Sequence, residues 1–455
     1  MVAVRKRGSV QLTRWVLIPL AAALSLLGLA GPAGASSSPG AAAAKLANAV
    51  SVASGGTDAC AVLSTGHVVC WGYGGQGQLG DGTTTNSDVP VAALGITKAK
   101  TVTADDSGSF CALLTTGHVA CWGYGYYGEL GDGSTTNSDV PVAVKTIATA
   151  TAVAGGQLDF CAVLSTGHVD CWGNGSYGAL GNGSEEDALV PTPVSAISNA
   201  AAVTGGPSDF CAVLSTGDVD CWGYGLDGEL GDGSTTTSLV PVAVQTISNA
   251  TAVTADIAEG AFCAVLATGD VDCWGANSSG ELGNGTTTNS DVPVTVTGIS
   301  TATALAGGFL GFCAVLSTGH MACWGANGFG QLGDGYNGDY SDVPRAVKDI
   351  KTATAVTVDA GTEGYGFCAV LSTGHVDCWG YGLDGELGDG TSSSSNVPVA
   401  VESIGQAAAV IGSDNGFCAL LSTGHVDCWG SGINGQLGDG TTTGSDVPVP
   451  VLAAS

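Results

Sequence analysis

Charged residues are scarce in this chain of 455 residues, and basic residues are the scarcest. Charged side chains make up 11% of the sequence, and 11 Lys and Arg stand against 40 Asp and Glu, which gives a formal net charge of −29. A surface this acidic repels phosphate backbones and anionic lipid. The composition therefore argues against nucleic acid and membrane surfaces as partners, and it favours basic partners or simply high solubility.

The sequence also lacks helix-forming runs of Glu, Lys, Leu and Ala, whereas its 74 glycines are typical of tight turns and short strands. It contains no Cys-x2-Cys zinc spacing, no Gly-x-Ser-x-Gly nucleophile elbow and no His-Glu-x-x-His motif. No pair of Cys and His stands apart from the pattern that fills the chain. We therefore expect an all-β protein that is not an enzyme and that uses neither a cofactor nor a metal.

The N-terminal segment has the features of an export signal. The stretch Arg5–Arg14 is basic, Trp15–Leu29 is almost wholly apolar, and Ala33-Gly34-Ala35 matches a cleavage site. The apolar run is shorter than the ~20 residues that span a bilayer, which disfavours a membrane anchor. The sequence thus predicts a signal peptide over residues 1–35, a flexible spacer over 36–48, and a secreted mature chain that is not inserted in a membrane.

Eight copies of a unit of about fifty residues fill the rest of the chain. One copy contains Cys221-Trp222-Gly223 and, after a glycine-rich stretch, a Val-Pro-Val segment. A fixed period of this length is typical of stacked or ring-shaped proteins, because one unit cannot bury its apolar face alone. Strands are predicted at Phe210–Leu214, Val219–Trp222, Val240–Val244 and Ala250–Thr254. Three to four short strands per unit favour a propeller blade over a solenoid, whose strands recur at shorter periods.

The sixteen cysteines form eight pairs whose members lie ten positions apart. Between Cys211 and Cys221 the midpoint is Thr216, next to Gly217, and a hairpin folded there sets the two cysteines opposite each other. An even number of cysteines in an exported chain is typical of disulfides, so we predict local pairing, with reduced, buried cysteines as the alternative. The predicted pairs are Cys60 with Cys70, Cys111 with Cys121, Cys161 with Cys171, Cys211 with Cys221, Cys263 with Cys273, Cys313 with Cys323, Cys368 with Cys378, and Cys418 with Cys428.

These recurring blocks resemble the regulator of chromosome condensation repeat. That repeat has a strand, a turn and a strand ending in Trp-Gly, then Gly-x-x-Gly-x-Leu-Gly-x-Gly, then a proline further on. Here Trp-Gly recurs eight times from Trp71 to Trp429, and Leu-Gly recurs from Leu79 to Leu437. The resemblance implies a β-propeller, a fold that this family usually builds with seven blades, and protein–protein interaction as its common use.

We therefore expect a single β-propeller over residues 49–455. Eight repeats favour eight blades, with seven blades and one irregular unit as the alternative. The last unit ends at Val447–Val451 without the strand that follows in other units, and the chain offers a matching segment at Asn48–Val52. We predict that this N-terminal strand joins the last blade and closes the ring.

Other recurring residues are interpreted as turn residues. Gly-x-Gly-x-x-Gly occurs in several units, as at Gly223, Gly225 and Gly228, but no helix follows it, which argues against nucleotide binding. Six histidines occupy one turn position, and the recurrent aspartates lack the spacing of a calcium loop. Neither set predicts a metal site.

One irregular stretch stands out from the repeat. The interval between first cysteines is longest, 55 residues, between Cys313 and Cys368. It holds aromatic and basic side chains of the kind that dominates protein-binding hot spots. The predicted partner-binding residues are Tyr336, Tyr340, Arg345 and Tyr365, and neutral drift of a surface loop is the alternative interpretation.

Together these features predict a secreted, disulfide-stapled, monomeric scaffold that binds a protein or glycan through the loops of one face. Two other functions are suggested by the resemblance. Exported seven-bladed inhibitors of β-lactamase are similar in fold, but this sequence has no matching binding residues to support that role. The family's eukaryotic namesake exchanges guanine nucleotide on a small GTPase and associates with chromatin. The export signal, the cysteine pairs and the acidic composition disfavour that activity here.

Overall fold

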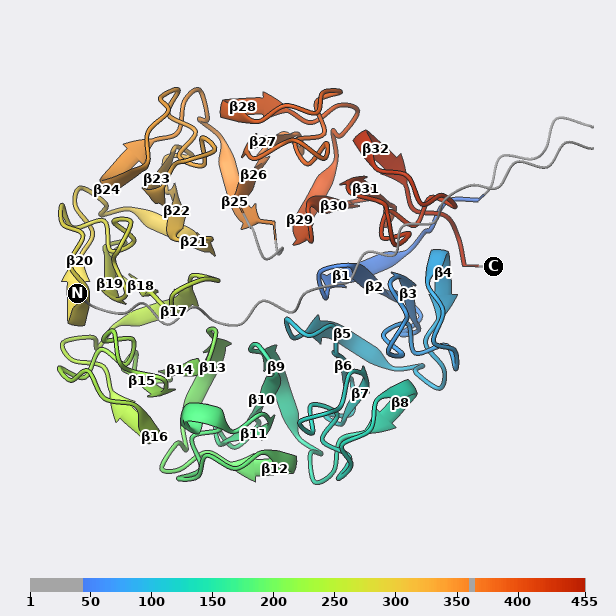
Figure 1. Ribbon diagram of the computed structural model, residues 1–455, viewed down its shortest axis with the longest axis horizontal. Coiled ribbons are helices and arrows are strands. Elements are labelled where there is room, and N and C mark those ends of the chain that lie inside the picture. Colours follow the sequence, from blue (N-terminus) through green and yellow to red (C-terminus); the bar gives the residue numbers. More distant parts are fainter. Residues whose placement is uncertain (1–43, 360–364, 455) are drawn as a thin grey trace, which may run out of the picture. The chain divides into compact units, whose positions relative to one another are not determined.

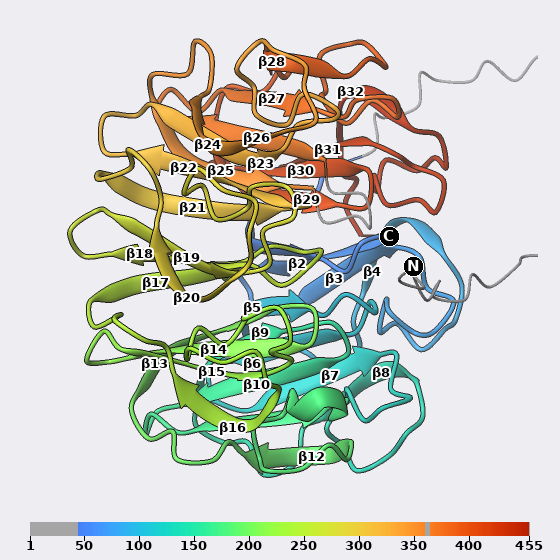
Figure 2. The same cartoon turned by 60° about the vertical axis from the view of Figure 1, so that its left-hand side comes forward.

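Eight four-stranded antiparallel sheets form a ring in the computed structural model, which describes residues 44–359 and 365–454. Each sheet is one blade, and the blades are numbered here from 1 to 8 in chain order (Figure 1). In the turned view of Figure 2, blade 1 lies between blade 2 and blade 8. The predicted all-β propeller with eight blades is confirmed, and the seven-blade alternative is wrong. The predicted signal peptide, residues 1–35, and residues 36–43 of the predicted spacer lie outside the described residues.

Within every blade the four strands follow chain order from the centre of the ring to its outer edge (Figure 1). The first strands line the centre: β1 (Ala49–Ser54), β5 (Ala99–Ala104), β9 (Ala150–Gly155), β13 (Ala200–Gly205), β17 (Ala250–Ala255), β21 (Ala302–Gly308), β25 (Ala353–Val358) and β29 (Ala407–Ser413). The second strands are β2 (Asp58–Leu63), β6 (Phe110–Leu114), β10 (Asp159–Leu164), β14 (Asp209–Leu214), β18 (Phe262–Leu266), β22 (Gly311–Leu316), β26 (Gly366–Leu371) and β30 (Gly416–Leu421). The third strands are β3 (Val68–Gly72), β7 (Val119–Gly123), β11 (Val169–Gly173), β15 (Val219–Gly223), β19 (Val271–Gly275), β23 (Met321–Ala326), β27 (Val376–Gly380) and β31 (Val426–Gly430). The outer strands are β4 (Ser87–Ala92), β8 (Ser138–Ala143), β12 (Ala188–Pro193), β16 (Ser238–Ala243), β20 (Ser290–Thr295), β24 (Tyr340–Ala346), β28 (Ser395–Ala400) and β32 (Ser445–Pro450).

A short 3-10 helix, η1 (Ser176–Gly178), lies in one loop of blade 3. Among the residues that the structure describes, no helix has the length and apolar character needed to cross a bilayer.

The second strand of each blade is buried along nearly all of its length because its two faces pack against different neighbours. In β14, Phe210 and Ala212 belong to the apolar core shared with blade 3, whereas Cys211 and Val213 belong to the core shared with blade 5. The outer strand of the same blade differs, since β16 has no buried residue and contains Pro241. Proline has no N–H to donate to a further strand, so it suits the outer edge of a blade.

All sixteen cysteines form the predicted disulfides, one in each blade. In blade 4, Cys211 of β14 lies directly opposite Cys221 of β15. The Cα atoms of the eight bridges are 4.0 to 4.1 Å apart, which is typical of facing residues that do not exchange backbone hydrogen bonds. The alternative of reduced cysteines is wrong. Each bridge staples the second and third strands of its blade.

One tryptophan from each blade attaches that blade to the preceding one. The indole of Trp274 is fully buried, and its Nε1 donates a hydrogen bond of 2.8 Å to the main-chain oxygen of Glu229 in blade 4. The same bond, 2.7 to 2.9 Å long, recurs at all eight junctions: Trp71 to Gln436, Trp122 to Gln78, Trp172 to Glu129, Trp222 to Ala179, Trp274 to Glu229, Trp324 to Glu281, Trp379 to Gln331 and Trp429 to Glu386. The recurrence of Trp-Gly and Leu-Gly in the sequence therefore reflects one contact between blades, repeated eight times.

The ring is closed differently from the prediction. The N-terminal strand β1 pairs with β2 as the first strand of blade 1, and blade 8 is complete with β29 to β32. The prediction that the N-terminal strand joins the last blade is therefore wrong. The two ends of the ring instead meet just before β1, where Lys45 forms an isolated bridge with Leu452 and the N–H of Leu46 donates to the oxygen of Val451 at 2.8 Å.

At the other junctions one continuous chain segment links two blades. At the closing junction two segments take its place, one before β1 and one after β32. Ile147 lies three residues before β9 and is 2% exposed, and Leu46 lies three residues before β1 and is 3% exposed. Leu46 thus fills the place of the buried isoleucine. The N-terminal strand belongs to blade 1 because each unit begins with its inner strand. The closing segments therefore meet at a blade boundary, and no blade is left incomplete.

The antiparallel strand order divides the connections between two sides of the ring. The turns between second and third strands and the links between blades lie on one side, called here the turn face. The connections between first and second strands and between third and fourth strands start from the other side, called here the loop face. Contacts between the two kinds of loop confirm this, since the N–H of Tyr224 donates to the oxygen of Ser208 at 3.1 Å. The loop face carries the less regular segments of each blade.

Candidate functional site

Exposed apolar side chains gather on the loop face, at the tips of the connections between third and fourth strands. Tyr126 of blade 2 is 62% exposed and Ile433 of blade 8 is 75% exposed. Four further blades present large apolar side chains at equivalent tips, namely Tyr177, Leu226, Phe329 and Leu383. All six residues lie four or five positions after the tryptophan of their blade. Because exposed apolar side chains that recur on one face are typical of interaction surfaces, we call this set the loop-face ring.

Four aromatic rings of blades 6 and 7 form a group called here the aromatic cluster: Phe309, Phe329, Tyr365 and Tyr381. The ring centroid of Tyr365 lies 4.8 Å from that of Phe309 and 4.7 Å from that of Phe329. The centroids of Phe329 and Tyr381 are 5.2 Å apart. These separations lie within the range in which aromatic rings attract each other. The cluster joins loops of two neighbouring blades on the loop face.

Of the aromatic cluster, sequence reasoning singled out only Tyr365. It missed Phe329, although this residue stands five positions after Trp324, as Tyr177 does after Trp172. An alignment of the eight units on their tryptophans would have found the loop-face ring, because the tip side chains follow the tryptophan by four or five positions.

The other three predicted residues come together elsewhere, at the outer part of blade 6. Tyr336, Tyr340 and Arg345 line one pocket of about 400 Å³, together with Asp334 and Asp342. The guanidinium carbon of Arg345 lies 5.9 Å from the ring centroid of Tyr336, and its Nε donates to Oδ2 of Asp334 at 3.2 Å. The structure thus divides the predicted residues between this blade-six pocket and the aromatic cluster. Their role in binding stays a prediction.

Buried glutamates lie beneath the loop face at the position before Leu-Gly. In blade 4, Glu229 is fully buried, and one of its carboxyl oxygens accepts the N–H of Asp227 at 2.8 Å while the other has no hydrogen-bond partner. Burial raises the pKa of Glu229 to about 7. The same raised pKa, about 7, is found for the corresponding residues of three other blades, Glu129, Glu281 and Glu386. Blades 1, 6 and 8 have glutamine here, and its Oε1 accepts the equivalent N–H.

Aspartates on neighbouring loops add to this set of carboxyl groups. Asp209 begins β14 and is 2% exposed. Burial first, and then the charges of Glu229 and Asp256, raise the pKa of Asp209 well above its usual value. As the pH rises, these groups therefore add negative charge close to one another. The electrostatics of the loop face favour a cationic partner over an anionic one.

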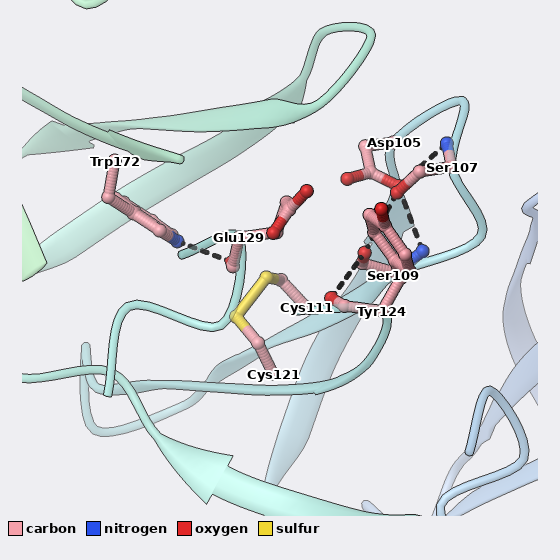
Figure 3. Close-up of a disulfide and its surroundings, with 8 residues drawn as sticks. All are labelled: Asp105, Ser107, Ser109, Cys111, Cys121, Tyr124, Glu129 and Trp172. Carbon is pink, nitrogen blue, oxygen red and sulfur yellow. Dashed lines mark hydrogen bonds between the residues drawn. A yellow bond between two sulfur atoms is a disulfide. The ribbon is translucent and has the colours of Figure 1, made fainter. Parts of the chain in front are cut away.

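Figure 3 shows the related arrangement in blade 2, beside the disulfide of that blade. Asp105 accepts hydrogen bonds from the N–H groups of Ser107 at 3.0 Å and Ser109 at 2.8 Å, which fixes the loop between β5 and β6. Trp172 of blade 3 reaches the main-chain oxygen of Glu129 in the same view. The carboxyl groups thus lie where the loop face meets the contact between blades.

The six histidines lie on separate blades at the turn face. His168, for example, is exposed, and its Nδ1 lies 3.0 Å from the hydroxyl of Thr166. In the ranges 44–359 and 365–454, no three His, Cys, Asp or Glu side chains are placed so that they could hold a metal ion. The candidate functional site is therefore the loop face with its aromatic cluster, together with the blade-six pocket.

Comparison with known proteins agrees with the repeat pattern. The model of the regulator of chromosome condensation (RCC1) repeat matches residues 65–113, 116–163, 166–213, 268–309 and 319–366, more than half of the chain. The chain belongs to the RCC1 repeat family. Each of the first three RCC1 segments begins in the turn of one blade and ends in the second strand of the next blade. The family unit therefore spans a junction between blades.

The similar proteins share this fold to different extents. A stretch of 100 residues, 22% of this chain, is 37% identical to the E3 ubiquitin-protein ligase HERC2 of Homo sapiens and to that of Mus musculus, and it spans 2% of their length. The crystal structure of human WBSCR16 has a TM-score of 0.61 at 21% identity, over 73% of this chain and 93% of that one. Prp20p of Saccharomyces cerevisiae, a structure described together with its binding properties to Gsp1p and histones, has a TM-score of 0.59 at 18% identity, over 77% and 89%. At these identities the solved structures establish the fold alone.

Proposed function

We propose that this chain is an exported, disulfide-stapled RCC1-type propeller that binds a protein partner through its loop face. The observation that carries the proposal is the loop-face ring, with exposed apolar side chains on six blades and the aromatic cluster beside them. Aromatic anchors dominate the energetics of protein interfaces. Eight disulfides and a closed ring hold these tips in place before binding, which lowers the entropy cost of association.

Export is supported by the predicted signal peptide over residues 1–35 and by the disulfides. Disulfides persist in oxidising compartments and are rare in the reducing cytosol. A chain in which all sixteen cysteines form bridges therefore suits the extracellular side of a membrane.

The chemistry of the loop face also indicates the kind of partner. The chain has a formal net charge of −29, and carboxyl groups lie beneath the exposed apolar tips. A partner with apolar side chains surrounded by Lys and Arg would complement both features. Protein partners are reported for distant relatives of the same fold, since yeast RCC1 (Prp20) was solved bound to Kap60. That likeness supports a protein as the partner class and says nothing of its identity.

An affinity capture with matched variants tests the proposal. The oxidised chain is immobilised, and culture fluid and isolated envelopes of the source cell are passed over it separately. The test variant carries Phe329→Ala and Leu383→Ala on the loop face, and the control variant carries His168→Ala on the turn face. We expect a protein that binds the wild type and the control and that the loop-face variant fails to retain.

Two outcomes would contradict the proposal. The first is a bound protein that is lost with His168→Ala and retained by the loop-face variant, because that protein would use the turn face. The second is the absence of any bound protein from both fractions. Circular dichroism of the three proteins checks that all of them are folded.

A further inference from the structure

The blade-six pocket is built from residues that set blade 6 apart from its repeats. Tyr336 follows Leu-Gly-Asp-Gly at the position where blade 4 has Ser234, and Arg345 stands where blade 4 has Val242. The loop is also longer, since eight positions separate Gly333 from Ser341 whereas seven separate the corresponding residues of blade 4. The remaining blades have Ser or Thr in place of Tyr336, and Val or Thr in place of Arg345. The pocket is therefore a feature of one blade and not of the repeat.

The walls of the pocket are held by contacts among their own side chains. Oδ1 of Asp334 accepts the N–H of Tyr336 at 2.9 Å, while Oδ2 of the same carboxylate accepts from Arg345. The guanidinium in turn lies 5.9 Å from the centroid of the Tyr336 ring. At the next position of the loop, Oδ1 of Asn337 accepts a 2.9 Å hydrogen bond from Asn396 of blade 7. A charged pair and a link to the next blade thus position an exposed aromatic ring.

Two exposed aromatic rings contribute to the pocket. Tyr336 is 68% exposed and Tyr340 is 50% exposed, and both line the same volume of about 400 Å³. This volume falls within the ~300–1,000 Å³ of small-ligand sites. The faces of such rings pack against flat arrays of C–H groups, and their hydroxyls both donate and accept hydrogen bonds.

The charges of the pocket restrict the ligand. The carboxylate of Asp334 is paired with Arg345, and Asp342 adds a second carboxylate. An anionic ligand such as a phosphate or a sulfated sugar would meet net negative charge there. A purely apolar ligand would take the Asp342 carboxylate out of water without giving it a hydrogen-bond donor. The ligand that fits is neutral, with hydroxyls around its edge and a flat face of C–H groups.

We propose that the blade-six pocket is a carbohydrate subsite that binds one neutral pyranose unit of a glycan. The C–H face of the sugar packs on Tyr336 or Tyr340, and its hydroxyls donate to Asp342 and accept from Arg345. None of the four rings of the aromatic cluster lines this pocket, and the assignment does not depend on the proposed protein partner.

Saturation-transfer NMR and calorimetry with the oxidised full chain test this assignment. The probes are the neutral disaccharides maltose, cellobiose and N,N′-diacetylchitobiose, and the anionic probe is a sulfated disaccharide. The test variant combines Tyr336→Ser and Arg345→Val, which restores the residues that blade 4 carries in a folded blade. The control variant is His168→Ala, which removes an exposed ring from the turn face of blade 3.

We expect at least one neutral disaccharide to bind the wild type and the control with equal affinity, with signal transferred to its ring C–H protons. The test variant should bind it about tenfold more weakly or not at all, given the loss of an aromatic stacking partner and a charged hydrogen-bond donor. Tyr336→Phe, which keeps the ring, should retain most of the affinity.

Three results would overturn the assignment. They are the failure of every neutral probe to bind the wild type, equal binding by the test variant, and binding confined to the sulfated probe. None of these results bears on the capture experiment, because neither Phe329 nor Leu383 lines the blade-six pocket. Failure of the capture experiment likewise leaves the carbohydrate assignment standing.

Discussion

Gly231→Ala should destabilise the propeller much more than Gly298→Ala. Gly231 has a φ of +62°, and a Cβ built on it would lie 2.9 Å from Cδ1 of Trp274 and 2.9 Å from Cγ1 of Val244. Gly298 has a φ of +75°, and a Cβ there would meet no heavy atom within 4 Å. Both substitutions place alanine in the left-handed region, but only the first forces a methyl group into the junction between blades 4 and 5.

The expected loss of stability is the sum of a backbone conformational cost and a packing cost. The left-handed conformation costs an L-residue about 1–2 kcal/mol, and this cost applies at both sites. Overpacking of a close-packed core adds about 1–3 kcal/mol, and it applies only to Gly231→Ala. We therefore expect the free energy of unfolding to fall by about 1–2 kcal/mol for Gly298→Ala and by about 2–5 kcal/mol for Gly231→Ala.

Denaturant unfolding of the oxidised proteins, followed by tryptophan fluorescence, measures the difference, because the buried indoles report directly on the junctions. Gly438→Ala provides a second comparison, since a Cβ at Gly438 would lie 2.9 Å from Cδ1 of Trp71 across the closing junction. Gly438→Ala should lower the free energy of unfolding by the same amount as Gly231→Ala. Equal destabilisation by Gly231→Ala and Gly298→Ala would refute the reasoning, because it would mean that the junction yields to an extra methyl group without cost.

Three further predictions concern the staples, the buried carboxyls and the closing junction. Replacing Cys211 and Cys221 together by alanine should lower the free energy of unfolding by about 2–3 kcal/mol, the entropy of a loop closed over 10 residues, in denaturant titration. Folding raises the pKa of Glu229 from 4.5 to about 7, so the native state keeps a proton that the unfolded chain releases. The stability that this proton gives the native state is fully present below pH 4.5. It is lost as the pH rises to about 7, so the free energy of unfolding falls over this range. Glu229→Gln should therefore flatten the decline of the melting temperature over this range. Leu46→Ala should lower the free energy of unfolding by about 2–5 kcal/mol, as Ile147→Ala should, because both side chains fill the same place in a junction.

Each of these predictions has a matched control. Dithiothreitol should lower the free energy of unfolding of the wild type by more than that of the cysteine variant, because the variant has no disulfide to lose in blade 4. Gln78→Glu should introduce a pH-dependent decline at blade 1, where the natural residue is neutral. A Leu46→Ala variant as stable as the wild type would show that the closing junction contributes little and that the ring is held by its other seven junctions.

Much of the fold was predictable because it is encoded within single units. Cysteines ten positions apart around a Thr-Gly turn fall opposite each other in any tight hairpin, so the pairing of Cys211 with Cys221 needed no knowledge of the ring. The eightfold recurrence of Trp-Gly likewise favoured eight blades over seven, and the structure shows why, since each tryptophan serves one junction.

The candidate site was less predictable because its residues come from different units. Tyr336 and Arg345 belong to one blade, and their unusual identities could be noticed in the sequence. Tyr365 instead packs against Phe309 and Phe329 of the preceding blade. Which loops touch across a junction depends on how the blades are inclined to each other, and that inclination is not written in any one repeat.

The sequence by itself therefore determined the all-β class, and it favoured the local disulfide pairing and eight blades over their alternatives, because hairpins and periodic contacts are local. Only the tertiary structure decided how the ring closes and where the carboxyl groups are buried. Leu46 and Val451 become neighbours because the curvature of the ring brings its two ends to one junction. Glu229 looks like a turn residue in the sequence, but it is fully buried because the next blade covers it. Such features depend on the arrangement of neighbouring blades, which short-range sequence patterns do not specify.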